Sequence, residues 1–241
     1  MEATVTTPPF AARPMIPGPT RALGRLLRSA PAFELHNPDA PDRTALEAYI
    51  AAQFARAYDA RISEYLPLLL SMQCRNRYSA VAGLRRASDS RLFVEQYLDE
   101  SIEQALSACV DHPITRADLV QIRNLVATHR GGCQMLFVLM AAMTHRAGIG
   151  WAVFSATRQV RRLISKLDFA AVPLGAADPA RLGDSTRLWG RYYDTEPELV
   201  AIDVATSIGR LEQSTLPAAV LALYRDRIDQ LACVTRAAAL Q

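Results

Sequence analysis

The chain has 241 residues, half of them hydrophobic, which is enough for one large domain with a sizeable core, with or without appendages. Its 27 basic and 24 acidic side chains leave a formal net charge of +3, a field too weak for a dedicated nucleic-acid binder. This composition excludes global disorder and a disulfide scaffold, and we expect no nucleic-acid partner.

The cysteines and the apolar runs bear on the protein's compartment. Four cysteines are scattered along the chain, and none stands at metal-ligand spacing from another cysteine or a histidine: Cys74, Cys109, Cys133 and Cys233. We therefore expect no metal site. The longest apolar run, residues 135–143, is about half as long as a membrane span, and the N-terminus lacks the pattern of a signal peptide. The sequence predicts a cytoplasmic protein with reduced thiols and no integral membrane segment.

The N-terminal part of the chain is predicted to hold a tail, a helix and two strands. Residues 1–31 contain six prolines and few apolar anchors, so we expect a disordered or extended segment there. Apolar residues at helical spacing predict a helix over residues 42–59, with a proline and an aspartate as its start signal. Residues 66–74 and 78–86 are predicted to be strands joined by a turn of hairpin length.

The rest of the chain alternates between helical and strand patterns. The predicted elements are a helix over 92–110, a strand over 119–127, a helix over 133–145, a strand over 150–154, a helix over 157–167 and a short strand over 171–174. Residues 206–241 are predicted to form a C-terminal helical extension, broken at Pro217. This alternation favours an α+β fold over residues 32–205, an α/β sandwich with helices on the sheet faces.

The most informative local feature is the glycine turn after the strand over 119–127. Its sequence is Thr-His-Arg-Gly-Gly, in which the candidate anion-binding residues are His129, Arg130, Gly131 and Gly132. Backbone N–H groups at a helix N-terminus attract phosphate, and adjacent glycines let it approach the main chain. A strand-to-helix turn also needs glycine for steric reasons alone, and the P-loop and dinucleotide-binding spacings are absent. Both interpretations remain open.

Two further sets of side chains could carry chemistry. Glu95 lies beside a mainly apolar face, which would raise its pKa and suit a general base, but it also suits the first turn of a solvated helix. A dense aromatic cluster could supply hydroxyls that protonate a leaving group or could simply anchor the core; its members are Trp189, Tyr192 and Tyr193. Cys133, at the expected start of a helix, would have a lowered thiol pKa, although small residues also occupy such positions for packing. Spacing alone does not decide among these alternatives.

Six short motifs occur in a fixed order along the chain. They are Tyr-Leu-Pro-Leu-Leu at 65–69, Ala-Val-Ala-Gly-Leu-Arg at 80–85, Leu-Phe-Val-Glu-Gln-Tyr-Leu-Asp at 92–99, Asn-Leu at 124–125, Trp-Gly at 189–190 and Tyr-Tyr at 192–193. Together they resemble the thermostable haemolysin family of bacterial proteins, over residues 33–204. That family in turn resembles the GNAT acyltransferase and acyl-homoserine-lactone synthase fold. The resemblance implies a splayed mixed β-sheet flanked by helices, whose central strands admit an acyl-thioester.

The resemblance also implies roles for single residues. The residues that match family signature positions, and that we expect around a pocket, are Arg85, Glu95, Gln96, Asn124, Trp189, Tyr192 and Tyr193. In this assignment either a carboxylate, for which Glu95 is the candidate, or water takes a proton from an amine, and Tyr192 or Tyr193 protonates the departing thiolate. The residues expected to bind the thioester co-substrate are Asn124, Arg130, Gly131 and Gly132. Those expected to bind the other substrate are Arg85, Gln96, His129 and Trp189.

The chain departs from the family pattern in its central strand. Where the family usually has Glu-Val-Gly-Asn-Leu-Ala, residues 121–126 read Gln-Ile-Arg-Asn-Leu-Val. Gln121 therefore replaces a glutamate, and Arg123 replaces a glycine. If that glutamate is the family's base, this protein is altered or inactive, or it relies on Glu95.

The glycine turn and the resemblance together favour an acyltransferase acting on a small-molecule amine. Acyl-CoA or acyl-phosphopantetheine would be the co-substrate, with no tightly bound cofactor. An acyl carrier protein, or a second copy of the chain in a homodimer, is a candidate partner. Two alternatives remain, a membrane-lytic protein, as the family name states, and a non-catalytic binding module, which the lost glutamate would fit. Against lysis, the apolar stripes are sized for a core.

Overall fold

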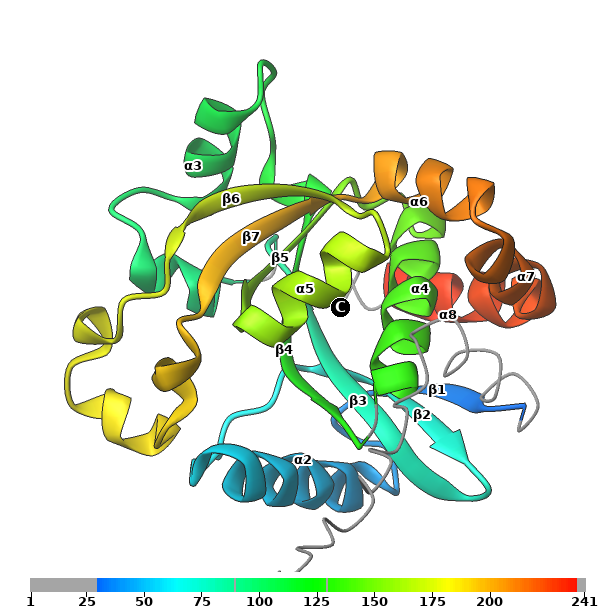
Figure 1. The fold of residues 1–241 in the computed structure, drawn as a ribbon, viewed down its shortest axis with the longest axis horizontal. Helices are drawn as coiled ribbons and strands as arrows, with labels where there is room; N and C mark the ends of the chain where they lie inside the picture. The colour runs from blue at the N-terminus through cyan, green and yellow to red at the C-terminus, as the bar shows by residue number, and fades with distance from the viewer. Residues whose placement is uncertain (1–29, 89, 129, 238–241) are drawn as a thin grey trace, which may run out of the picture.

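A single mixed sheet runs through the fold. The computed structural model describes residues 30–88, 90–128 and 130–237 (Figure 1). The described residues form a seven-stranded sheet in the order β1-β2-β3-β4-β5-β7-β6. The strand bounds are Ala32–His36 (β1), Leu68–Cys74 (β2), Arg77–Arg86 (β3), Leu119–Ala127 (β4), Trp151–Ala156 (β5), Ala170–Ala176 (β6) and Glu198–Asp203 (β7). Neighbouring strands pair antiparallel, except β4 and β5, which pair parallel.

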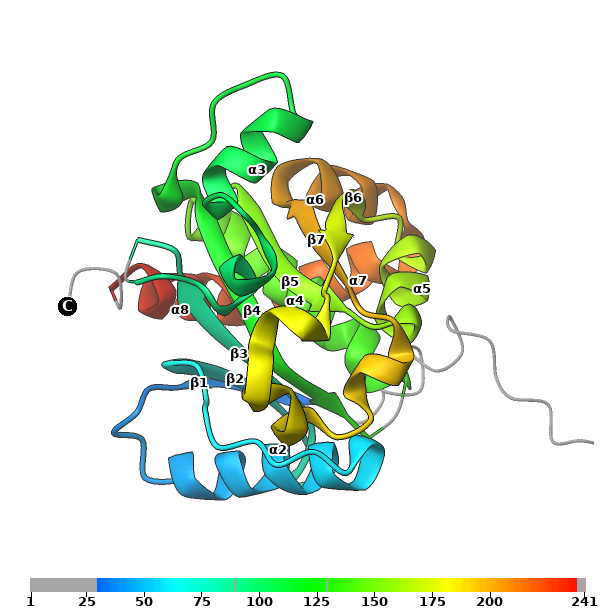
Figure 2. The same cartoon turned by 90° about the vertical axis from the view of Figure 1, so that its left-hand side faces the viewer.

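Helices cover both faces of this sheet. The α-helices are Arg43–Tyr58 (α2), Ile102–Cys109 (α3), Arg130–Arg146 (α4), Arg158–Lys166 (α5), Val204–Gln213 (α6), Thr215–Leu223 (α7) and Arg225–Ala237 (α8). Short 3-10 helices span Phe93–Tyr97 (η1), Arg116–Asp118 (η2), Pro179–Trp189 (η3) and Tyr192–Thr195 (η4). Helices α4 to α8 pack on one face, and α2, α3, η1, η3 and η4 pack on the other (Figures 1 and 2). The predicted α+β class, with helices flanking a mixed sheet, is confirmed.

The core occupies both faces of the sheet. On β3, Ala80 and Ala82 pack toward α4, while Val81 between them packs toward α2. Successive side chains of a strand point to opposite faces, so a strand covered on both sides needs apolar residues at every position. The apolar run at residues 135–143 belongs to α4, which lies between the sheet and helices α6 to α8. Among the described residues, no helix combines the length and the apolar character that crossing a membrane requires.

Most predicted elements are confirmed within a few residues, and β4 has the predicted bounds. The sequence pattern does not reveal two strands, β1 and β7. Strand β1 has only five residues, and β7 is a short apolar run without alternation, a pattern shared by buried helices and buried strands. The predicted disordered segment over residues 1–31 lies almost entirely outside the described residues.

The prediction of one continuous helix over residues 92–110 is wrong. The chain is extended at Leu98, with φ −111° and ψ 154°, and this separates η1 from α3. Ser101 is the N-cap residue of α3. The carboxylate of Glu95 accepts the N–H of Ile102 at 3.2 Å, so a side chain from η1 satisfies the first turn of α3.

The predicted break at Pro217 is also displaced. The interruption lies at Ser214, between α6 and α7, and Pro217 sits in the first turn of α7. Proline is tolerated there because the first N–H groups of a helix have no partner within the helix.

Candidate active site

The sheet opens between β4 and β5. These strands pair only through residues 119–121 and 151–153, although β4 continues to Ala127. Strand β5 pairs with β7 over its whole length instead. In the described part of the chain, β4 beyond Gln121 therefore has no strand partner on its β5 side. Backbone groups along that edge are available to a ligand.

A cavity of about 70 Å³, partly open to solvent, lies at this opening. Two of its walls come from β4 and β5, through Ile122, Arg123, Asn124, Leu125, Phe154 and Ser155. Aromatic rings from α2, η1, η3 and η4 cover it, namely Phe54, Tyr58, Phe93, Trp189 and Tyr192. No aspartate, glutamate or histidine is among the described residues that line it. Chemistry here depends on hydroxyls, main-chain amides and one guanidinium.

Asn124 bends β4 at the opening. Its φ is +56°, in the left-handed region that asparagine tolerates better than most residues. Its Oδ1 accepts the N–H of Leu66 at 3.1 Å, and its Nδ2 donates to the carbonyl of Glu64 at 3.1 Å. A Cβ at Gly83 would lie 3.0 Å from Asn124 Oδ1, so glycine at that position leaves room for the carboxamide. Asn124 therefore lies at the cavity as expected, with its side chain committed to shaping the strand edge.

The aromatic cluster forms one wall of the cavity. Trp189 and Tyr192 line it, and the Tyr192 hydroxyl lies 3.0 Å from Ser155 Oγ. The Tyr193 hydroxyl instead lies 2.5 Å from that of Tyr97, and Tyr193 is not among the lining residues. Burial raises the pKa of Tyr192 well above its ordinary value and raises the pKa of Tyr193 to about 12. Both hydroxyls therefore stay protonated at neutral pH.

Gln121 and Arg123, the two residues that depart from the family pattern, both contact Phe93 of η1. Gln121 is buried, and its Oε1 accepts the N–H of Phe93 at 3.0 Å, which holds η1 against β4. The guanidinium carbon of Arg123 lies 4.3 Å from the centre of the Phe93 ring and 5.6 Å from that of Trp189. Among the described residues, Arg123 Nε has no hydrogen-bond partner, and burial lowers the pKa of this guanidinium.

The expected rise in the pKa of Glu95 is wrong. Burial alone would raise it, but hydrogen bonds from Arg116 and from the N–H groups of Leu92 and Ile102 hold the pKa of Glu95 below its ordinary value. Glu95 is not among the residues that line the cavity, and its side chain is 4% exposed. Its charge stabilises the joint between η1 and α3.

The glycine turn is the first turn of a helix rather than a loop before one. Helix α4 begins at Arg130, and Gly131 and Gly132 are buried within its first turn. This helix start follows the end of β4 closely, so it lies at the end of the strand edge that lacks a partner. The candidate His129 lies outside the described residues. Burial raises the thiol pKa of Cys133 to about 12, so the expected lowered value is wrong.

The structure brings together only part of the expected site. The expected residues gathered around the opening are Arg85, Asn124, Trp189 and Tyr192. Arg85 lines a second cavity, beside Arg123. Gln96 is exposed and is not among the residues lining either cavity. Sequence reasoning missed Ser155 as the partner of Tyr192, because 37 positions separate them and no local pattern links them.

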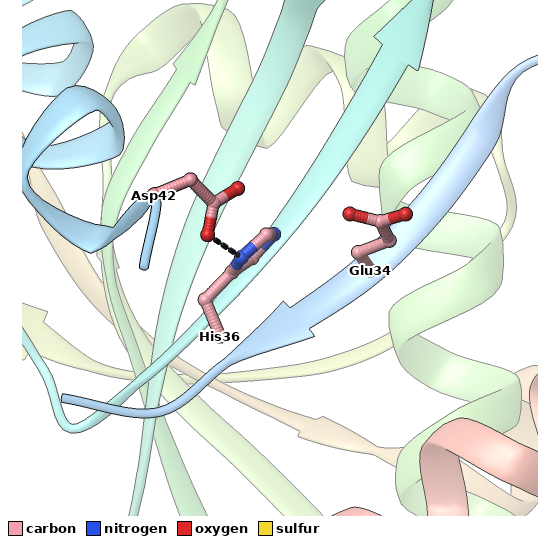
Figure 3. Close-up of side chains that lie close together, drawn as sticks. All are labelled: Glu34, His36 and Asp42. Atoms are coloured by element: carbon pink, nitrogen blue, oxygen red, sulfur yellow. Dashed lines mark hydrogen bonds and ion pairs between the residues drawn. The ribbon is translucent and has the colours of Figure 1, made fainter. Parts of the chain in front are cut away.

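A second polar cluster lies on β1 and at the start of α2 (Figure 3). His36 Nδ1 lies 2.8 Å from Asp42 Oδ1, and His36 Nε2 lies 2.9 Å from Ser71 Oγ, the connectivity of a hydrolase triad. Ser71 is 0% exposed and His36 is 4% exposed, so a substrate has no access to the serine. Glu34 is near enough for these groups to share a metal ion, but both imidazole nitrogens already have partners. We interpret the cluster as a structural hydrogen-bond network that joins β1, β2 and the start of α2.

Comparison with protein families assigns the chain to one family. The family described as Thermostable hemolysin matches residues 36–208, well over half of the chain. The chain therefore belongs to the thermostable hemolysin family, and the resemblance carried by its motifs is confirmed. A comparison with curated proteins finds no match.

Solved structures share the fold at low sequence identity. TofI in an apo form is 13% identical, with 75% of this chain and 96% of TofI covered and a TM-score of 0.52. TofI in a ternary complex with an inhibitor and MTA gives the same identity and coverage, with a TM-score of 0.51. The acyl-homoserine-lactone synthase LasI is 9% identical, with 73% of this chain and 91% of LasI covered and a TM-score of 0.50. The likeness at these identities concerns the fold, and it agrees with the GNAT-like sheet that the motifs imply.

Proposed function

We propose that this protein transfers an acyl group from an acyl-CoA or acyl-phosphopantetheine thioester to the amine of a small molecule. The observation that carries the proposal is the opening between β4 and β5, where an unpaired strand edge borders a cavity of about 70 Å³. A pantetheine arm carries amide groups along its length and can hydrogen-bond to such an edge as an added strand does. The fold shared with the acyl-homoserine-lactone synthase LasI supports this use of the opening.

The proposed reaction uses the main chain and one hydroxyl pair. Backbone N–H groups on the free edge of β4 polarise the thioester carbonyl, as an oxyanion hole does. The amine nitrogen attacks the carbonyl carbon, the C–N bond forms, the C–S bond breaks, and one proton passes from nitrogen to sulfur. Tyr192, protonated and hydrogen-bonded to Ser155, donates to the departing sulfur and relays that proton.

The amine must be neutral when it attacks. No carboxylate or imidazole is found among the described residues that line the cavity, so the ammonium form loses its first proton to water. Glu95 is unsuited to this step, because Arg116 and two backbone N–H groups occupy its oxygens. The proposed rate therefore follows the neutral fraction of the amine.

One observation favours a second candidate, a non-catalytic binding module. Gln121 acts as a structural acceptor for the Phe93 N–H at the position where the family usually has a glutamate. A protein that had lost its base could keep the cavity and bind a thioester without turning it over.

Incubation with thioesters and amines separates these candidates. Purified protein is given acyl-CoA or acyl-carrier-protein thioesters of graded chain length together with a pool of amines. We expect N-acyl products by mass spectrometry, with one free thiol released per product. Thioester binding without product would favour the binding module, and liposome leakage without product would favour the membrane-lytic alternative.

Tyr192→Phe tests the hydroxyl relay. We expect this variant to lower kcat by about 10²-fold, because the departing sulfur loses its proton donor. The matched control is Tyr224→Phe, which removes a hydroxyl bonded to the Pro31 carbonyl, away from the residues that line the cavity. Equal kcat values for both variants would remove Tyr192 from the reaction.

A further inference from the structure

A second cavity adjoins the first. It has a volume of about 570 Å³, is open to solvent, and lies between α2, the segment before β2, and strands β3 and β4. Arg123 lines both cavities, so the two meet at its side chain. The charged residues that line the second cavity are two arginines and two glutamates: Arg85, Arg123, Glu47 and Glu64.

The two arginines stand side by side. Across β3 and β4, Arg85 pairs with Gln121 and Gly83 pairs with Arg123, which makes the arginines diagonal neighbours on one face of the sheet. In the described parts of the chain, the side chain of Arg85 has no hydrogen bond or ion pair. Its charge adds to the burial of Arg123 in lowering the pKa of the Arg123 guanidinium. Two adjacent cations in this position favour an anion between them.

Arg123 also has donor capacity that the protein does not use. Its side chain is 14% exposed, and its Nε is buried without a partner among the described residues. The ion pair between Arg123 Nη2 and Glu64 Oε2 is long, at 3.4 Å, and the Glu64 side chain is 77% exposed. Because Glu64 is exposed and the contact is long, a ligand carboxylate can displace Glu64 from Arg123 at small cost. A guanidinium fork matches a carboxylate in geometry and binds it through two hydrogen bonds.

We propose that Arg85 and Arg123 together bind the carboxylate of the acyl acceptor, which makes the acceptor an amino acid. This inference rests on the proposed acyl transfer. The mixed charge of the second cavity favours a zwitterion over a phosphate, because Glu47 and Glu64 repel a phosphate dianion and attract an ammonium group. An amino acid whose carboxylate contacts Arg123 has its amine only a few bonds away, at the border of the cavity proposed for the thioester.

Paired acceptors test this inference by steady-state kinetics. Each amino acid is compared with its carboxamide, which keeps the amine and lacks the carboxylate. We expect the wild-type KM for an amino acid to be about 10- to 100-fold below that for its carboxamide. Arg85→Gln and Arg123→Gln each raise the KM for the amino acid by about tenfold and leave the KM for the carboxamide within about twofold. The matched control is Arg77→Gln, an exposed arginine on the same strand as Arg85, which changes neither KM.

Two results would overturn the inference while leaving acyl transfer intact. One is an equal wild-type KM for amino acid and carboxamide. The other is a parallel loss of activity toward both acceptors in the arginine variants, which would mean that the arginines act only on the structure. Melting temperatures of the variants, measured alongside, separate unfolding from loss of recognition.

Calorimetry without thioester separates this inference from the proposed function. Free amino acids, their carboxamides and inorganic phosphate are titrated into wild type and the three variants. Binding of amino acids that both Arg85→Gln and Arg123→Gln abolish supports carboxylate recognition even if no acyl transfer is found. Tighter binding of phosphate than of any amino acid would overturn the assignment to an amino acid.

Discussion

Glu95 and Tyr192 are both buried, and their surroundings shift their pKa values in opposite directions. Arg116 and backbone N–H groups favour the charged form of Glu95, whereas burial raises the pKa of Tyr192, whose hydroxyl contacts the hydroxyl and the carbonyl of Ser155. Glu95 is therefore held as a carboxylate with a structural role, and Tyr192 remains a proton donor at neutral pH.

Glu95→Gln tests this distinction. We expect the free energy of unfolding to fall by about 2 kcal/mol, because Arg116 loses one of its two carboxylate partners while the η1–α3 joint keeps at most part of its hydrogen bonding. Acyl transfer by the folded protein should keep its kcat. The control is Glu100→Gln, at an exposed position in the same segment. Unchanged urea denaturation together with abolished turnover would restore Glu95 as the base.

The pH profile of the reaction provides a second test at this scale. We expect kcat/KM for the amine to rise about tenfold per pH unit up to the pKa of the amine itself, because none of the described residues that line the cavity is a carboxylate that could act as a base at lower pH. The pKa of Tyr192 is raised above its ordinary value near 10, so its hydroxyl stays protonated below that pH and imposes no falling limb. A rise that levels off near pH 5 to 6 would instead indicate a carboxylate base.

The motifs predict several residues of the cavity and miss others for a definite reason. Trp189, Tyr192 and Asn124 stand in recognisable motifs and line the cavity. The role of Glu95 is fixed by Arg116, which is 21 positions away in a segment without any motif. Local spacing cannot report a partner of that kind, because contacts between distant segments depend on the tertiary fold.

At the scale of elements, the bend in β4 determines the shape of the opening. Asn124 holds the left-handed conformation, and its carboxamide ties β4 to the segment before β2. Gly83 on β3 leaves the space this carboxamide occupies. The bend therefore depends on a glycine of one strand and an asparagine of the next.

Gly83→Ala tests this dependence. Its Cβ would lie 3.0 Å from both Asn124 Oδ1 and Leu66 Cβ, so the carboxamide must shift and its bonds weaken. We expect a loss of about 1–3 kcal/mol in stability and a fall in acyl transfer at temperatures where the protein is folded. The control is Gly209→Ala in α6, where a Cβ meets nothing within 4 Å and stability should stay equal or rise. Wild-type activity in Gly83→Ala would contradict a role for the bend.

Helices and strands whose apolar residues recur at regular spacing can be predicted from the sequence, whereas short or interrupted elements cannot. Strand β4 and helix α2 combine clear periodicity with clear ends. The interruption between η1 and α3 contains no glycine or proline that would predict it. It is stabilised by the hydrogen bonds that the buried Glu95 carboxylate accepts from Leu92 and Ile102, rather than by local propensity. Strand β7 is apolar at successive positions because both its faces are covered, and this removes the alternation that identifies a strand.

At the scale of the whole molecule, the polar cluster of His36, Asp42 and Ser71 joins the N-terminal elements to the sheet. Figure 3 shows the contact between His36 and Asp42. Asp42 also accepts a hydrogen bond from Tyr78 at 3.0 Å, so it joins the start of α2 to β1 and β3. Burial opposes the charge of Asp42, but these hydrogen bonds lower its pKa below the ordinary value.

Asp42→Asn tests the contribution of this hydrogen-bond network through the pH dependence of stability. A carboxyl group whose folded pKa is lowered stabilises the fold above its unfolded pKa, and that contribution disappears as the pH falls through the folded value. We therefore expect the variant to be less stable than wild type by about 1 kcal/mol at pH 7, with the difference shrinking below about pH 4. Urea denaturation across this range measures it. A difference that stays constant with pH would contradict the assignment.

The central claim is that an acyl-thioester occupies the opening between β4 and β5, and a co-crystal structure tests it most directly. The ligand is a thioether analogue of acyl-CoA, which cannot transfer its acyl group. We expect the pantetheine arm alongside β4 beyond Gln121, hydrogen-bonded to its backbone, with the acyl chain in the cavity lined by Phe154 and Trp189. An analogue bound elsewhere on the protein, with this cavity left empty, would contradict the claim.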